Sequence, residues 1–185
     1  MRTVQYLSEI IEELKRSVEL ISDEEAEKLV NGILEAKKVF VAGAGRSGFM
    51  ARSFAMRMMH MGIDAYVIGE TVTPNFEPDD ILIIGSGSGE TKSLVSMAEK
   101  AKSISGKITA VTIFPDSTIG KLADFTIKLP GSPKDQTEGD YKTIQPMGSL
   151  FEQTLLLFYD AIILRFMEKK GLNTGKMYGR HANLE

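Results

Sequence analysis

Hydrophobic residues recur at helical spacing through the first 36 positions of the chain. Over about residues 7–21 the apolar side chains lie three or four positions apart, with glutamate and lysine between them, which is the pattern of an amphipathic helix. Ser22-Asp23-Glu24-Glu25 then has the form of a capping box, which predicts a second helix that ends near Ala36. We expect these helices to pack on a sheet or on a partner chain.

From Lys38 the pattern changes to short, nearly continuous apolar runs separated by helical stretches. The runs predict five strands, at 39–42, 65–68, 81–84, 108–113 and 125–129. Helices are expected between them at about 47–61, 90–104 and 117–123. Strands this apolar are typical of a parallel sheet that helices cover on both faces. The chain is therefore predicted to be α/β, a small doubly wound domain with a five-stranded parallel sheet.

The remainder of the chain contains a polar segment, a long apolar helix and a tail. Pro130–Gln145 is rich in glycine, proline and charge, so we expect an exposed loop. The helix predicted from about Gly148 to Lys170 is apolar on nearly every side and should be buried on every side. Because a domain of this size rarely encloses such a helix, we infer a subunit interface. Residues 171–185 are expected to form a polar tail.

Composition and charge exclude several classes of protein. The 185 residues suit one domain, with helices in 1–36, the sheet in 38–130 and the long helix and tail in 148–185. The chain has no cysteine, which excludes disulfides and thiolate catalysis. A formal net charge of −3 argues against non-specific nucleic-acid binding. No secretion signal and no apolar run of roughly 18 residues are found, so we expect a cytoplasmic protein that does not enter a membrane.

Gly43-Ala44-Gly45-Arg46-Ser47-Gly48, directly after the first predicted strand, is the first of two glycine-rich turns. It matches the GxGxxG fingerprint of dinucleotide sites, and Glu70 lies near the position of the acidic residue that such sites use for the ribose. The same glycines could also serve only close packing of a strand against a helix. The first turn by itself leaves both interpretations open.

The second turn, Gly85–Thr91, follows the third predicted strand and opens the next helix. Glycines let backbone amides converge on an anion at a helix N-terminus, where the helix dipole also favours negative charge. The turn has no lysine, so it is not a triphosphate loop, and its alternative interpretation is a plain serine-capped helix. The candidate phosphate-binding residues are Ser86, Gly87, Ser88, Gly89 and Thr91.

Both turns follow parallel strands, at the sheet edge where open α/β sheets bind ligands. A phosphorylated metabolite bound at the second turn could extend its carbon chain across Gly45 and Ser47. Arg46 is the cation nearest to either turn, and it could contact the substrate or remain a surface residue.

Glu152 is the candidate general base. It enters the long apolar helix just after a polar loop, and partial burial there would favour a proton acceptor near neutral pH. Its alternative role is to complement the dipole of that helix. The second acid/base candidate is His181, in its own subunit or a neighbouring one, and the rival is His60, which a structural role at a helix end would also explain. Two histidines make a His-rich metal site improbable.

Five segments together resemble the 6-phospho-3-hexuloisomerase family of the sugar isomerase (SIS) superfamily. They are 43–48, 53–62, 69–74, 86–91 and 145–152, and the likeness continues into residues 180–184. The resemblance implies a three-layer α/β/α sandwich of the flavodoxin or Rossmann type, a homotetramer, and no metal or organic cofactor. It also implies a phosphorylated hexulose as substrate, with interconversion of D-arabino-3-hexulose 6-phosphate and D-fructose 6-phosphate in the ribulose monophosphate pathway of formaldehyde fixation.

The predicted mechanism moves the carbonyl from C3 to C2 through a 2,3-enediol(ate). Glu152 removes the C2 proton and returns it to C3, His181 or His60 moves protons between the oxygens, and Arg46 with amides near Gly45 stabilises the enediolate. Two other functions stay open on the sequence. One is a non-catalytic sugar-phosphate sensor, which needs Ser86–Thr91 but no base, and the other is a dehydrogenase.

Overall fold

The computed structural model describes residues 2–132 and 141–184, and its centre is a wholly parallel five-stranded sheet. The strands lie in the order β2-β1-β3-β4-β5. Their bounds are β1 Val39–Gly43, β2 Ala65–Val67, β3 Ile81–Gly85, β4 Lys107–Thr112 and β5 Phe125–Lys128. All five predicted strands are confirmed, and no end differs from the prediction by more than one residue.

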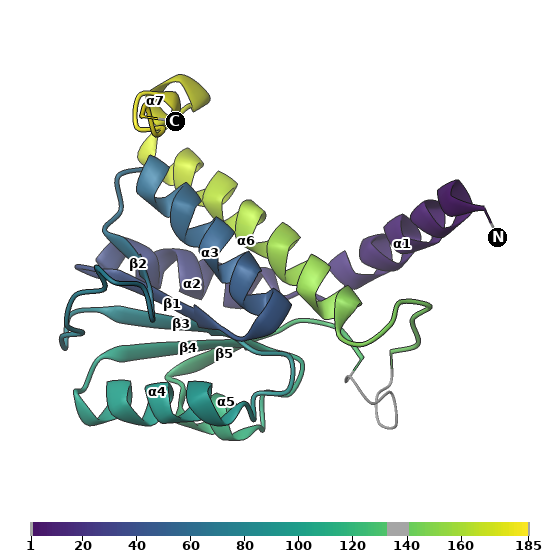
Figure 1. Ribbon diagram of the computed structural model, residues 1–185, viewed down its shortest axis with the longest axis horizontal. Coiled ribbons are helices and arrows are strands. Elements are labelled where there is room, and N and C mark those ends of the chain that lie inside the picture. Colours follow the sequence, from purple (N-terminus) through teal and green to yellow (C-terminus); the bar gives the residue numbers. More distant parts are fainter. Residues whose placement is uncertain (1, 133–140, 185) are drawn as a thin grey trace.

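Helices cover both faces of the sheet and complete three layers (Figure 1). The described helices are α1 Thr3–Val18, α2 Asp23–Glu35, α3 Gly45–His60, α4 Lys92–Ser103, α5 Thr118–Leu122, α6 Ser149–Lys170 and α7 Thr174–Tyr178. Helices α2, α3 and α6 share one core with the sheet, and α4 and α5 share the other. Helix α1 projects from the body of the molecule (Figure 1). The three-layer α/β/α prediction is confirmed.

Alternation along β1 assigns its side chains to the two cores. Val39 and Val41 pack among α2, α3 and α6, whereas Phe40 and Ala42 pack against α4. This period of two follows from the pleat of a strand, and both faces are buried because helices lie on each. On the α3–α6 side, the rings of Phe54 and Tyr159 stack with centroids 4.2 Å apart.

The order of the strands determines where a ligand can bind. Strands β1 and β3 are neighbours at the centre of the sheet, yet β1 leads into α3 on one face and β3 leads into α4 on the other. The chain therefore diverges at the carboxyl ends of these two strands, and a crevice opens where α/β proteins of this order bind ligands. Both glycine-rich turns lie there.

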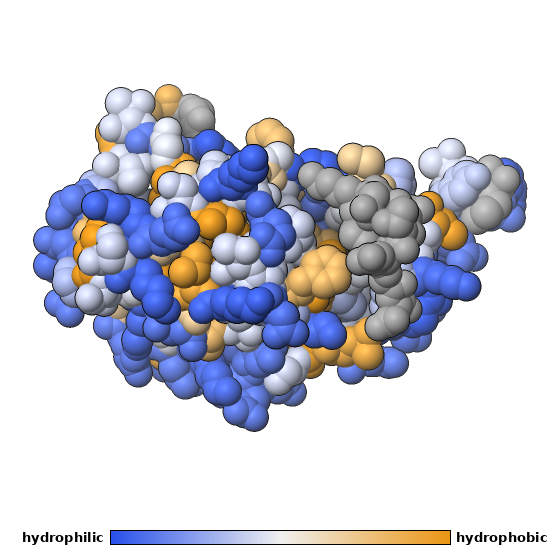
Figure 2. Space-filling model, turned by 90° about the horizontal axis from the view of Figure 1, so that it is seen from below, coloured by the Kyte–Doolittle hydropathy of each residue, from blue (hydrophilic) through white to orange (hydrophobic). Residues whose placement is uncertain are grey.

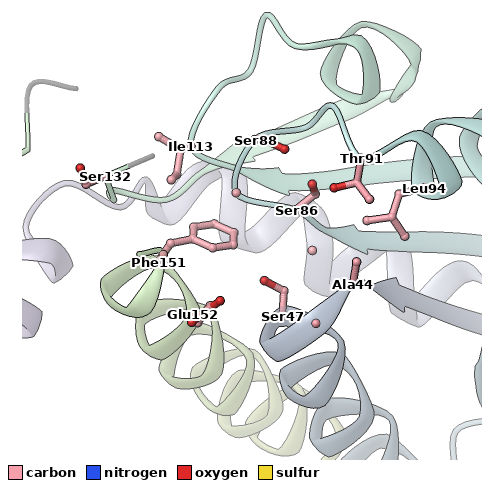
Figure 3. Close-up of a pocket in the computed structure, with 14 residues that line it drawn as sticks. Ala44, Ser47, Ser86, Ser88, Thr91, Leu94, Ile113, Ser132, Phe151 and Glu152 are labelled. Atoms are coloured by element: carbon pink, nitrogen blue, oxygen red, sulfur yellow. The ribbon is translucent and has the colours of Figure 1, made fainter. Parts of the chain in front are cut away.

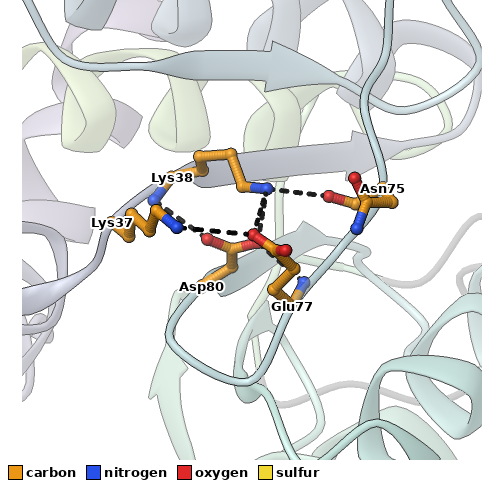
Figure 4. Close-up of polar contacts among 5 residues, drawn as sticks. All are labelled: Lys37, Lys38, Asn75, Glu77 and Asp80. Carbon is orange, nitrogen blue, oxygen red and sulfur yellow. Dashed lines mark hydrogen bonds and ion pairs between the residues drawn. The ribbon is translucent and has the colours of Figure 1, made fainter.

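At the opposite end of the sheet, Asp80 ties the segment between β2 and β3 to the start of β1 (Figure 4). The fully buried carboxylate of Asp80 accepts the Lys38 amide at 3.1 Å and the Glu77 amide at 2.8 Å. Lys38 Nζ lies 3.3 Å from the same carboxylate and donates to the Asn75 carbonyl at 2.9 Å. This arrangement fixes the amino ends of β1 and β3, far from the crevice.

For α1, the structure leaves only packing on a partner chain from the two expected arrangements, and it corrects part of the predicted exposed loop. Inside this chain α1 does not bury its apolar stripe, since Leu7, Ile11 and Val18 are exposed and its buried residues are Glu13 and Ser17. The expected exposed loop is wrong for Pro130–Ser132 and Gln145, which are buried, and residues 133–140 lie outside the described part of the chain.

Within this chain the long helix leaves part of its apolar surface uncovered, as the inferred subunit interface requires, and the segment expected to be a polar tail contains a helix. Helix α6 buries eleven residues, but Leu157 and Leu164 on its outer side are 48% and 65% exposed. The tail contains the short helix α7, which Asn173 caps by accepting a hydrogen bond from the Lys176 amide. Among the described helices, none combines the length and apolar character needed to cross a membrane.

Candidate active site

The turn after β3 presents the hydroxyl groups that the sequence assigned to a phosphate. Ser86 Oγ accepts a hydrogen bond from the Gly89 amide, and Ser88 Oγ accepts one from the Glu90 amide, both at 3.2 Å. Because both oxygens act as acceptors, their protons remain available for an anion. Thr91 is the N-cap residue of α4, and its side chain makes no capping hydrogen bond. The start of α4 adds its unpaired amides and positive dipole end.

Gly89 makes this turn possible although it does not line the cavity. Its φ is 64°, a left-handed conformation that side chains disfavour. A Cβ at this position would lie 1.9 Å from Ser117 Oγ. The residue is therefore required for the path of the backbone, and its amide supports Ser86.

Glu90 is the acidic residue of the turn, and it points toward α5. Its two carboxylate oxygens accept from the Thr118 amide and the Thr118 hydroxyl, each at 2.7 Å. These two hydrogen bonds lower the pKa of Glu90 below its ordinary value. The negative charge is thereby engaged at the start of α5 and does not oppose an anion at Ser88.

On the other side of the crevice, α3 and α6 bring Arg46 and Glu152 together. Arg46 Nη1 donates to Ser149 Oγ at 2.8 Å and lies 2.8 Å from Glu152 Oε2. This second contact is an ion pair without hydrogen-bond geometry, so Oε2 keeps its acceptor capacity. The Glu152 side chain is 9% exposed, whereas that of Arg46 is 52% exposed. The carboxylate is thus held in a largely dry wall beside a cation that reaches solvent.

A cavity of about 420 Å³ connects the two sides (Figure 3). Ser86, Ser88 and Thr91 lie on one side of it, and Ser47 and Glu152 face it from α3 and α6. Of the predicted site residues, the following line the cavity: Gly45, Ser47, Ser86, Gly87, Ser88, Thr91 and Glu152. Arg46 does not line the cavity itself, but it lies at the edge of the cavity because it pairs with Glu152. Its volume is in the range of small-molecule sites.

The two histidines lie elsewhere in this chain. His60 ends α3 and is 4% exposed, and its ring lies 5.4 Å from that of His181, between centroids. Arg57 Nη1 lies 3.2 Å from His60 Nδ1. Burial, Arg57 and His181 lower the pKa of His60. Since α3 and α6 begin at the cavity and the histidines lie where α3 ends, neither histidine reaches Glu152 of its own chain.

The sequence reasoning missed part of the cavity wall. The missed lining residues are Ala44, Gly85, Leu94, Ile113, Ser132, Gly148 and Phe151. Ile113 directly follows β4, and Ser132 follows β5 after three intervening residues. The rule that ligands bind at the carboxyl ends of strands could have identified both. Phe151 packs against the second turn, where a Cβ on Gly87 would lie 3.2 Å from its ring.

The structure also bears on the dinucleotide interpretation. Glu70, the residue that would accept the ribose hydroxyls, forms an ion pair with Arg52. A Cβ on Gly43 would lie 2.9 Å from the Gly48 amide nitrogen, so these glycines serve close packing of β1 against α3. The first turn is thereby explained without a dinucleotide.

Comparisons with known proteins agree with this geometry. The SIS domain model matches residues 32–157. The chain is 61% identical to the 3-hexulose-6-phosphate isomerase of Bacillus subtilis, with 100% of both chains covered. It is 37% identical to the enzyme of that name from Mycobacterium gastri, over 97% of this chain and 89% of the relative.

A solved structure of a Methanococcus jannaschii protein has a TM-score of 0.82 and 37% identity, and 100% of each chain is covered. Its description infers a molecular function of 3-hexulose-6-phosphate isomerase. The match to the domain model and the full-length identity together establish that this chain belongs to the SIS domain family, among relatives named 3-hexulose-6-phosphate isomerase.

Proposed function

We propose that this chain interconverts D-arabino-3-hexulose 6-phosphate and D-fructose 6-phosphate in the ribulose monophosphate pathway of formaldehyde fixation. The observation that carries the proposal is that the hydroxyl-rich turn and Glu152 line one cavity. The names of its full-length relatives support the same reaction. A sensor would need the turn but no buried carboxylate beside it, so the sensor alternative is not favoured.

The phosphate is proposed to bind at Ser86, Ser88 and Thr91, where hydroxyl protons and the start of α4 converge. A phosphomonoester is doubly charged near neutral pH, and amides and hydroxyls at a helix N-terminus bind such a group without lysine. The sugar chain then extends across the cavity toward Ser47 and Glu152. The 3-ketose cannot close a ring onto its phosphorylated O6, so it binds in the open form.

Glu152 is proposed to remove the proton on C2. The electrons of that C–H bond form the C2–C3 double bond, and the C3 carbonyl oxygen becomes the enediolate oxygen. The same carboxylate then returns the proton to C3, and loss of the proton on O2 creates the C2 carbonyl. Arg46, at the edge of the cavity, stabilises the negative charge as it develops.

Moving a proton between O2 and O3 needs a second acid/base group, and the described lining of the cavity offers only Glu152. We assign this role to His181 of a neighbouring copy, in a homotetramer. His60 is the weaker choice because it is buried beside Arg57. The exposed position of His181 leaves its ring available to another subunit.

The decisive experiment supplies 3-hexulose 6-phosphate to the purified chain and detects fructose 6-phosphate by a coupled reaction. We expect turnover in the wild type and a loss of at least about 100-fold in kcat for Glu152→Gln, because the amide cannot accept the C2 proton. Binding of fructose 6-phosphate without turnover in the wild type would instead favour the sensor. Thermal stabilisation by NAD but not by fructose 6-phosphate would favour the dehydrogenase.

The role of His181 is tested by mixing subunits. Glu152→Gln and His181→Ala are each expected to be nearly inactive alone. Mixed oligomers of the two variants should regain part of the activity, because some sites would combine an intact Glu152 with an intact His181 from another copy. Activity that does not rise on mixing would contradict a role for His181 in trans.

A further inference from the structure

Helix α1 contacts the rest of the chain through a buried carboxylate. Glu13 is 3% exposed, whereas its neighbours Glu12 and Arg16 are exposed. One oxygen accepts the Thr143 hydroxyl at 2.6 Å and the Gln145 side-chain amide at 2.9 Å, and the other accepts the Ile144 backbone amide at 2.7 Å. The donors are three consecutive residues of the segment that leads into α6.

The hydrogen bonds of this contact have a defined direction, with Glu13 as the acceptor. The Thr143 hydroxyl donates to Glu13 and accepts the Gln145 backbone amide at 3.0 Å. The Glu13 backbone carbonyl accepts the Tyr141 hydroxyl at 3.2 Å as well. Burial by itself would raise the pKa of Glu13, but the hydrogen bonds from Thr143, Gln145 and Ile144 outweigh it and hold the pKa below its usual value. The segment is therefore held by an ionised acceptor.

The held segment ends three residues before the cavity. Gly148 lines the cavity, Ser149 accepts from Arg46, and Glu152 lies in the first turn of α6. Between the held segment and Gly148 lies Met147, a residue other than glycine whose φ is 58°. Such a conformation is strained and persists only where the structure on both sides imposes it. Here Glu13 fixes one side and α6 fixes the other.

We propose that Glu13 is a positioning residue for the active site: by holding Thr143–Gln145 it fixes the first turn of α6, and with it the placement of Glu152 against Arg46. This inference rests on the proposed function, since it assigns Glu13 a purpose in placing the proposed base. Glu13 touches no reacting atom and acts only through the segment. An apolar side chain at position 13 could not take this role, because it could not accept the hydrogen bonds from Thr143–Gln145.

The first test compares Glu13→Gln with Glu12→Gln. Both remove one negative charge from α1, but only Glu13 contacts the segment. We expect Glu13→Gln to lower kcat by about 10- to 100-fold, since small displacements of catalytic groups have effects of this size. KM should change by less than about threefold, because the phosphate turn is untouched. Glu12→Gln should match the wild type.

A second pair separates positioning from a general loss of stability. Thr143→Val keeps the shape of the side chain but loses the hydroxyl that links Glu13 to Gln145, whereas Thr143→Ser keeps that hydroxyl. We expect the valine variant to lower kcat as Glu13→Gln does and the serine variant to remain within about threefold of the wild type. Equal losses in the two variants would overturn the proposal.

Hydrogen exchange of the backbone gives a readout that needs no catalysis. In Glu13→Gln we expect faster exchange across residues 141–152 and unchanged exchange across the turn 85–91. Unchanged exchange across 141–152, or an equal rise throughout the chain, would overturn the positioning role. If Glu152→Gln retains turnover, the proposed base is wrong, while exchange in Glu13→Gln still reports whether Glu13 holds the segment.

Discussion

At the scale of single residues, the chemistry of the site depends on which atoms face the cavity. Ser88 and Glu90 are two positions apart, yet the Ser88 hydroxyl lines the cavity while the Glu90 carboxylate binds Thr118. The cavity is thereby left with donors at one end and Glu152 at the other. Such a division suits a substrate with a phosphate at one end and an acidic C–H bond at the other.

Ser88→Glu is expected to abolish binding of a sugar phosphate. The new carboxylate would project where the phosphate is proposed to bind, and like charges placed together cost several kcal/mol. Affinity for fructose 6-phosphate, measured by calorimetry, should fall by about 100-fold or more. Ser96→Glu, at an exposed position on α4, is the control for added charge and should bind normally. Undiminished binding in Ser88→Glu would place the phosphate elsewhere.

The pKa of Glu13 predicts a dependence of stability on pH. Its folded-state pKa is lowered from the ordinary value of 4.5, so the folded chain binds this proton more weakly than the unfolded chain does. The stabilisation is therefore complete above about pH 4.5 and is lost as the pH falls through the folded-state pKa. Urea unfolding should show a wild-type advantage over Glu13→Gln that is largest at pH 7 and shrinks below pH 4.5. An advantage that is constant down to pH 3 would contradict this.

At the scale of elements, local sequence determines most helix and strand boundaries. Ser22 accepts from the Glu25 amide at the start of α2, as the capping pattern predicted. The apolar runs become strands because they are covered on both faces, and the glycine-rich turns follow β1 and β3 as expected. Helix α1 forms as its pattern predicts, but no described part of this chain covers its exposed Leu7, Ile11 and Val18.

Asp80 allows the stability of the fold to be tested separately from the active site, because it joins the amino ends of β1 and β3 and does not line the cavity. Asp80→Asn removes the charge that pairs with Lys38 and leaves one buried acceptor where two now serve backbone amides. We expect a loss of about 3 kcal/mol in the free energy of unfolding, as for other broken buried pairs. Asp79→Asn, the exposed neighbour, should be close to neutral. The kcat of Asp80→Asn, assayed while folded, should stay near that of the wild type.

At the scale of the whole molecule, the two helix layers differ in the apolar side chains that they expose. Helix α6 exposes Leu157 and Leu164, and α3 exposes Phe49, Met56 and Met59. Helices α4 and α5 expose no large apolar side chain, and in the view from their side blue predominates, with some orange areas between (Figure 2). This asymmetry supports association of copies through the α3–α6 side, as the proposed tetramer requires.

Leu164→Glu is expected to disrupt that association, because Leu164 is 65% exposed on α6 and a buried carboxylate at an interface is unfavourable. Light scattering after size exclusion should give the wild type a mass near four times 20.4 kDa and the variant a smaller one. The variant should also lose activity if His181 acts in a neighbouring site. Ser96→Glu on α4 should keep the wild-type mass, and a monomeric wild type would contradict the tetramer.

The sequence by itself determined most of the elements, the parallel sheet and the position of the glycine-rich turn proposed for the phosphate, because strand periodicity, capping and glycine conformation are local properties. It also singled out Glu152, the proposed base, which lines the cavity, since a carboxylate at the start of an apolar helix is visible in the pattern. Only the tertiary structure decided that Arg46 pairs with Glu152, that Glu90 faces α5, that Glu13 holds Thr143–Gln145, and that His181 lies beside His60. Those contacts join residues that can be more than 100 positions apart in the chain, and their partners depend on how the layers pack, which no local pattern encodes.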